Sequence, residues 1–189
     1  PQAALRYYTL RDTTTAFGSD WQNWDYVASE AYHMLGRFDE ELAVARAAKA
    51  REPRTLGHWT REVTALAALG RVDELDRIIN ESYGLERQGA PELLSNTAAW
   101  VLSRHGFVEP AREFAQRAVA GYEQWPASAR EVPGARNVLR NSLAVLSDYE
   151  ALWQSYDEQS RRQGAQGLGS RILGARFRIM MGDTTGVLA

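Results

Sequence analysis

Cysteine is absent from this chain of 189 residues, and that absence excludes several kinds of site at once. No disulfide can form, and no thiolate is present to bind a metal or to act as a nucleophile. No apolar run approaches the roughly eighteen residues of a membrane-spanning helix, and no signal peptide opens the sequence. The same composition also occurs in secreted bacterial proteins, but we expect a cytoplasmic chain that meets no membrane.

An excess of positive charge is also missing. The chain has 22 basic and 24 acidic residues, which gives a net charge of -2. Nucleic-acid surfaces usually need a basic excess or a basic stripe, whereas these basic residues are scattered along the chain. Arg161 and Arg162 form a basic doublet near an expected helix end, where they complement the helix dipole. We therefore expect no nucleic-acid partner for this segment.

Catalytic and metal-binding motifs are lacking as well. His33, His58 and His105 are isolated from one another, and none has a second histidine at the spacing that places two on one helix face. Residues 164–171 have glycines five apart, but Ser170 stands where a phosphate-binding loop needs lysine. There is no Gly-x-Ser-x-Gly segment. We expect no enzyme activity, no metal and no cofactor.

What the sequence has instead is a short phrase that returns along the whole chain. Its two clearest copies read Leu-Gly-Arg, an apolar residue and two acids, and they contain Gly36 and Gly70. Looser copies are centred on Gly106, Ser147 and Gly182, so that the steps are 34, 36, 41 and 35 residues. A period in the middle thirties is typical of stacked two-helix units, none of which buries its apolar face without a neighbour.

The phrase itself predicts a turn between two antiparallel helices. Gly36 and Gly70 can take the left-handed backbone conformation that ends a helix. The acids that follow fall in the first turn of the next helix, where the dipole favours negative charge. Pro110 suits the same position, because its missing N–H would be unpaired there anyway.

The sequence thus predicts one all-α solenoid of about five antiparallel helix pairs. A first helix covers about 2–12, and the step of 41 is explained by an insert around Trp125–Ser128. The expected helix pairs are 22–35/38–51, 56–69/72–86, 91–105/108–124, 134–146/149–162 and 168–181/184 onward. The corresponding units are a partial unit 1–20, then about 21–54, 55–90, 91–132, 133–167 and a truncated 168–189.

With period and turn in place, the chain resembles the tetratricopeptide repeat family. The resemblance depends on a large, a small and a large residue in each first helix, on Gly in the turn, and on Ala and Pro after it. Matching residues are Ser29, Tyr32, Ala48 and Pro53 in the first full unit, Trp59 and Leu66 in the second, and Ala99, Leu102, Ala111 and Ala118 in the third. Arg140 and Arg178 depart from the pattern in the fourth and fifth units. The family's fold would be a right-handed α-α superhelix.

That family geometry implies a concave groove lined by the first helix of each pair. The groove residues would be Tyr26, Glu30, His33, Asn96, Trp100, Arg104, Asn137, Asn141 and Arg176. Related repeat proteins use such asparagines to hold the backbone of an extended peptide, since an amide both donates and accepts. Arg104 and Arg176 would take a carboxylate, and Trp100 would be an apolar anchor. The alternative is that these are solvated residues or helix–helix bonds.

We therefore expect a scaffold that binds a peptide or a partner domain in its groove. A second hypothesis is a regulatory sensor attached to a transcription regulator or kinase, which responds to a small effector. A third is self-association through truncated ends. Because the first residue is Pro1, we expect a fragment of a larger protein. Its Ala- and Arg-rich sequence resembles repeat regions attached to bacterial regulators or kinases, which implies a bacterial protein. An open polar groove would favour a peptide, and a deep apolar pocket would favour an effector.

Overall fold

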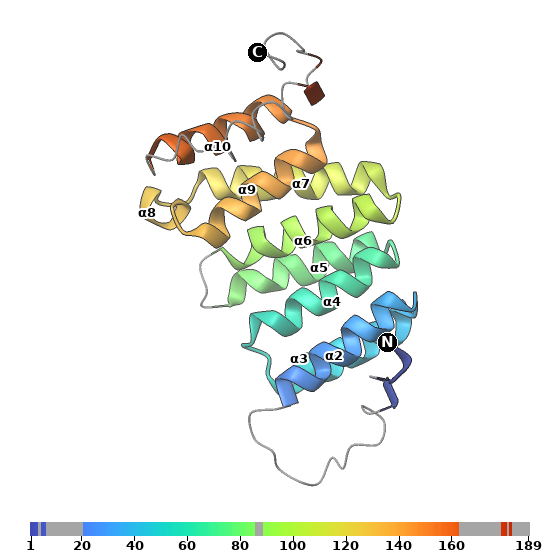
Figure 1. The fold of residues 1–189 in the computed structure, drawn as a ribbon. Coiled ribbons are helices and arrows are strands. Elements are labelled where there is room, and N and C mark those ends of the chain that lie inside the picture. The colour runs from blue at the N-terminus through green and yellow to red at the C-terminus, as the bar shows by residue number, and fades with distance from the viewer. Residues whose placement is uncertain (4, 7–20, 86–88, 163–178, 181, 183–189) are drawn as a thin grey trace.

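The structure is a computed structural model that describes residues 1–3, 5–6, 21–85, 89–162, 179–180 and 182. These residues form helices and no strand, so the predicted all-α class is confirmed. The helices follow one another in chain order, from α2 and α3 at one end of the molecule to α10 at the other (Figure 1). Their bounds are α2 Trp21–Met34, α3 Phe38–Arg51, α4 Leu56–Ala68, α5 Val72–Glu81, α6 Ala90–Arg104, α7 Val108–Glu123, α8 Ala127–Arg130, α9 Pro133–Leu146 and α10 Tyr149–Arg162.

Most predicted helix bounds agree with the structure to within a residue or two. The main difference is α5, which ends at Glu81 and continues as the 3-10 turn Ser82–Gly84 instead of reaching residue 86. The buried Ser82 hydroxyl donates to the Ile79 carbonyl at 2.6 Å and tightens the chain there. The insert contains a short helix, α8, that the sequence did not predict. Most of the expected helix 2–12 and of the pair 168–181/184 onward lies outside the described residues.

The same hydrogen-bonded turn ends the first helix of four consecutive hairpins, α2, α4, α6 and α9. Gly36, Gly70 and Gly106 have φ values of 68°, 66° and 85°, as the repeated phrase predicts. In each turn the glycine N–H donates three residues back, and the next N–H donates five residues back, as in the Schellman motif. The fourth turn has the same two bonds around Ser147, whose φ of 59° is the one positive value at a non-glycine among the described residues. The repeat in sequence is therefore a repeat in backbone geometry.

The largest apolar cluster of the core extends from α3 to α7 and is richest at α4 and α6, and smaller clusters lie at α2 and between α9 and α10. Helix α6 packs against α4, α7 and α9, and α4 also packs against α3. Small side chains such as Ala65, Ala98 and Ala99 are fully buried and allow these helices to approach closely. Large buried residues fill the space between them: Leu66, Leu75, Ile78, Ile79, Leu94, Leu102 and Phe114. No helix in the described part of the chain is long and apolar enough to cross a membrane.

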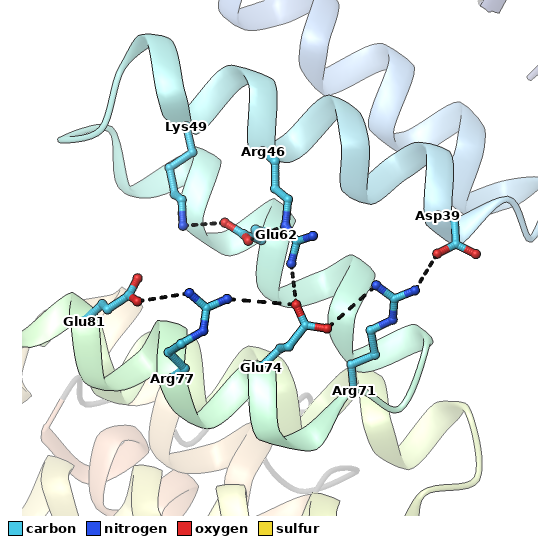
Figure 2. Close-up of polar contacts among 8 residues, drawn as sticks. All are labelled: Asp39, Arg46, Lys49, Glu62, Arg71, Glu74, Arg77 and Glu81. Atoms are coloured by element: carbon cyan, nitrogen blue, oxygen red, sulfur yellow. Dashed lines mark hydrogen bonds and ion pairs between the residues drawn. The ribbon is translucent and has the colours of Figure 1, made fainter.

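A network of ion pairs joins α3, α4 and α5, and we call it the α3–α5 network (Figure 2). Its centre is Glu62, whose side chain is only 4% exposed and is held by Arg46 at 2.9 Å and Lys49 at 2.5 Å. Arg46 also reaches Glu74 at 2.5 Å, and these carboxylates raise the pKa of Arg46. The eight members are Asp39, Arg46, Lys49, Glu62, Arg71, Glu74, Arg77 and Glu81.

We predict that Gly70→Ala destabilises the protein more than Gly36→Ala does. Both substitutions place a side chain at positive φ, which costs about 1 kcal/mol. Only at Gly70 would the new Cβ lie 2.5 Å from the ring of Phe107, in the next hairpin's turn. At Gly36 nothing lies within 4 Å. Urea unfolding should separate the two variants by more than about 1 kcal/mol, and equal losses would show that the Phe107 contact contributes nothing.

We also predict that Glu62→Gln lowers the free energy of unfolding by about 2 kcal/mol, since hydrogen bonds to charged groups are worth roughly that. The change leaves Lys49, which is 20% exposed, without its carboxylate. The matched control is Glu81→Gln, at the exposed end of the network, which should change stability by less than about 0.5 kcal/mol. Equal effects in thermal unfolding would mean that burial of Glu62 has no energetic role.

Candidate binding face

Helices α2, α4, α6 and α9 are the first helices of successive hairpins, and their solvent-facing side chains form the candidate site. On α6, the residues at helical spacing along this side are Leu93, Thr97, Trp100 and Arg104. On α9 the same side carries Gly134, Asn137 and Asn141, and Gly134 lies beside Leu93 in one pocket. We call this surface the first-helix face; it comprises Tyr26, Glu30, Arg61, Leu93, Thr97, Trp100, Arg104, Gly134, Asn137 and Asn141.

Two aromatic side chains on the first-helix face each carry a stacked guanidinium. Trp100 is 38% exposed, and Arg104, one turn further along α6, lies 4.7 Å from its ring centroid. Tyr26 of α2 is 50% exposed, and Arg61 of α4 lies 4.8 Å from its ring. Such stacking holds a flexible arginine in place and leaves its N–H groups free to donate. Each pair thus places a positively charged guanidinium, held by stacking, beside an exposed aromatic ring.

Arg61 is a half-buried arginine on this face. Burial lowers the pKa of its guanidinium, while the nearby charges of Asp25, Tyr26 and Glu30 act in the opposite direction. Its Nε is buried and has no hydrogen-bond partner, and its Nη1 lies 3.3 Å from His58 Nδ1. Neither Arg61 nor Arg104 forms an ion pair with a carboxylate within the described ranges. An anionic group would therefore find two guanidinium groups on this face that form no direct ion pair with a described carboxylate.

The sequence predicts His33 as a groove residue, but in the structure its side chain also contacts residues of other helices. Its Nδ1 lies 2.8 Å from Glu41 of α3, and its ring packs against Phe38 and against His105 at the end of α6. Glu41 is 2% exposed; burial raises its pKa, and the hydrogen bond from His33 opposes that shift. Burial, and then the charge of His33, lowers the pKa of His105. His33 thus joins the ends of α2, α3 and α6, while Glu30 is exposed.

Asn96 is placed differently from the groove position that the sequence predicts. It is 7% exposed, and its Oδ1 accepts a hydrogen bond from the fully buried Ser142 hydroxyl at 3.2 Å. Asn96 therefore bonds α6 to α9. A helix–helix bond was the alternative left open for the predicted groove residues. The reason lies in the helical register, since Asn96 follows the buried Leu94 and Ser95 and precedes Thr97 on the open side.

The two remaining asparagines do lie on the surface. Asn137 is exposed and Asn141 is half-buried, one turn apart on α9, so their amides share one side of the helix. Between them Arg140 turns inward and is 8% exposed. Its guanidinium donates to the Ser155 carbonyl at 2.8 Å and stacks on Tyr156 of α10, which explains an arginine where the repeat pattern has a small residue. Arg176, the last predicted groove residue, lies outside the described residues.

An apolar pocket opens at the end of the first-helix face where α4, α6 and α9 begin. Its volume is about 310 Å³. Trp125, from the insert before α8, forms one wall and packs so closely on Gly89 that a Cβ there would lie 2.5 Å from the indole. The lining residues are Leu56, Gly89, Leu93, Trp125, Ala129, Val132, Gly134, Ala135 and Val138.

Sequence reasoning missed two residues that the structure brings to this face. Arg61 was not predicted, because its importance depends on Tyr26 of a different helix. Trp125 was assigned to a linker, because nothing local shows that it folds back onto Gly89. The sequence did contain a signal for this contact. Gly89 directly precedes a helix, and a tryptophan lies in the long insert of the repeat.

Comparisons with protein-family models, with curated proteins and with solved structures found no match to this chain. Among the described residues there is no group of three His, Asp or Glu side chains placed to hold a metal ion. The functional argument therefore rests on the geometry of the first-helix face.

We predict that Asn96→Ala destabilises the protein by about 1–2 kcal/mol, because it leaves the buried Ser142 hydroxyl without its acceptor. The matched control is Asn137→Ala on the exposed side of α9, which should change stability by less than about 0.5 kcal/mol. Chemical unfolding measures both. If the two variants are equally stable, Asn96 is not a structural bond and its assignment to the surface is restored.

Proposed function

We propose that this chain is a protein-interaction module that binds a peptide or a partner domain along the first-helix face. In this proposal the helix pairs form a tetratricopeptide-like superhelix, and the first-helix face is its concave groove. The proposal includes no catalytic step, no cofactor and no nucleic acid. The observation that carries it is the row of exposed or half-buried polar and aromatic side chains on α2, α6 and α9: Tyr26, Trp100, Arg104, Asn137 and Asn141.

The rigidity of the face supports this role. Each contact residue stands on a helix that also carries buried residues, and the two arginines are held by aromatic stacking. A surface that is already ordered binds more tightly, because less conformational entropy is lost on association. Asn137 and Asn141 can each donate and accept, as an extended backbone requires. Trp100 supplies exposed aromatic area, which is enriched in binding hot spots.

The charge distribution also supports binding on this side. In the α3–α5 network every arginine and lysine contacts a carboxylate, whereas Arg61 and Arg104 stack on aromatic rings instead. Guanidinium groups that lie next to exposed rings and form no direct ion pair with a described carboxylate favour a partner that carries carboxylates among apolar residues. Glu30 is exposed on the same face, so the surface is mixed and not uniformly positive.

The sensor hypothesis remains the second candidate, because the apolar pocket is the kind of feature that favours a small effector. In that role the chain would respond to a ligand on behalf of an attached regulator or kinase domain. Self-association would be a third use of the same surfaces. Of these two alternatives, only the sensor has a specific observation in its favour, which is the apolar pocket.

We predict that the double variant Asn137→Ala/Asn141→Ala folds normally and loses partner capture. The experiment is a pull-down from the native host with wild-type protein and the variant side by side, read by mass spectrometry. A partner recovered at least tenfold less by the variant is the expected result, since two asparagines contribute about 1.4 kcal/mol or more together.

The matched control is Glu113→Ala/Gln116→Ala, two exposed residues on α7, outside the first-helix face. This control should capture the partner as wild type does. If the control and the α9 variant lose the partner equally, or if both retain it, the first-helix face is not the binding surface.

A further inference from the structure

The apolar pocket is built by the one place where the chain departs from its repeat. From the turn at Gly106 to the turn at Ser147 the step is 41 residues, and the additional segment between α7 and α9 folds back as Trp125–Val132 with α8 at its centre. Trp125, Ala129 and Val132 of this segment face Leu56, Leu93 and Val138 at the starts of the first helices. The feature therefore belongs to this chain and not to the repeat as such.

The wall that Trp125 forms is fixed by its neighbours. Gly89 has a φ of 80°, and the indole lies where a side chain at this position would have to be. The ring of Tyr122 lies 5.4 Å from the indole centroid and is tilted by 47° to it. Tyr122 is itself anchored, since its hydroxyl donates to the Arg130 carbonyl at 3.2 Å. Trp125 is thus held in place as part of the pocket wall.

The lining determines the chemistry that the pocket accepts. None of the nine lining residues has a charged side chain, and the indole N–H of Trp125 is the only polar side-chain group among them. Val138 is 2% exposed at the base, whereas Val132 is 55% exposed at the rim. An exposed apolar rim above a buried apolar base is typical of a ligand site. A charged ligand would lose its hydration here and gain no ion pair.

The size is that of a small molecule with two rings. The pocket of about 310 Å³ lies at the lower end of the range of roughly 300–1,000 Å³ for ligand sites. An apolar cavity of roughly 150 Å³ binds benzene, so about twice that volume accommodates a bicyclic ring system. Ring stacking on Trp125 favours a planar ligand over a branched aliphatic one.

We propose that this pocket is a binding site for a small, planar, uncharged aromatic molecule of about two fused rings. Gly134 gives the site its depth. It is the second residue of α9, its φ is not positive, and a Cβ built there has nothing within 4 Å. A larger side chain at 134 would occupy the pocket without displacing the backbone. The site goes beyond the proposed function and does not depend on peptide binding.

The test uses indole as the probe and isothermal titration calorimetry as the measurement. Wild-type protein should bind indole saturably at one site. Indole-3-carboxylate should bind at least tenfold more weakly, because no lining residue is cationic. Gly134→Leu should weaken indole binding at least tenfold, since the leucine side chain takes the ligand's place.

The matched control is Gly57→Leu. Gly57 is the second residue of α4, as Gly134 is of α9, it also has free space at its Cβ, and it does not line the pocket. Its indole affinity should stay within twofold of wild type. If Gly134→Leu does not fold, as judged by circular dichroism, Val132→Asp at the exposed rim replaces it and should weaken indole binding to a similar extent.

Absence of saturable indole binding to wild type would overturn the proposal, as would equal binding by wild type and a folded Gly134→Leu. A third result would also overturn the proposal: wild type binds no indole, and Gly134→Leu loses a protein partner that wild type captures. The pocket would then receive an apolar side chain of that partner.

Discussion

The left-handed turn that ends each first helix is the constraint on which the remaining structure depends. Two backbone bonds reverse the chain at Gly36, Gly70, Gly106 and Ser147 in the same way, so each second helix leaves at a similar angle. Because the geometry repeats, the apolar sides of α3 to α7 meet in one large buried cluster. The contact of Phe107 with Gly70 links one turn to the next, which makes the spacing between hairpins as well defined as the hairpins.

Charged side chains have opposite surroundings on the two sides of the molecule. On the side of α3 and α5, ion pairs connect helices that are distant in sequence, as Arg71 does with Asp39 at 2.7 Å (Figure 2). Exposed pairs of this kind contribute little singly, but Glu62 brings two cations to a buried carboxylate. On the first-helix face, Arg61 and Arg104 are held by rings. Basic side chains join helices on the side of α3 and α5, whereas two arginines on the first-helix face remain available to a partner.

The helices could be predicted from the sequence because their determinants are local. The turn glycines, the acids after them and the apolar periodicity all act within a few residues, and the bounds of α3 and α10 were correct as predicted. The predicted end of α5 was wrong, because the observed end depends on one serine hydroxyl that bonds the carbonyl three residues earlier. Local signals could not show this preference, since Ser is equally compatible with a surface position in a continuing helix.

The site was less predictable, because it depends on which helices meet. Register along one helix correctly placed Trp100 and Arg104 on the surface but did not separate Asn96, which bonds Ser142 across the α6–α9 interface. The inward turn of Arg140 likewise requires Ser155 and Tyr156 of another helix. Pairwise contacts between elements determine these roles, and a single sequence carries no direct record of them.

The short helix α8 shows how a repeat chain can change without being rebuilt. Helix α9 still packs against α7 and α6, so the longer connection before it leaves the order of the hairpins intact. An addition at such a boundary disturbs only its immediate neighbours, whereas the same addition inside a helix would rotate every later side chain to a new direction. The boundaries between hairpins are therefore the positions at which evolution can lengthen this chain and give one copy of the repeat a surface that its siblings do not share.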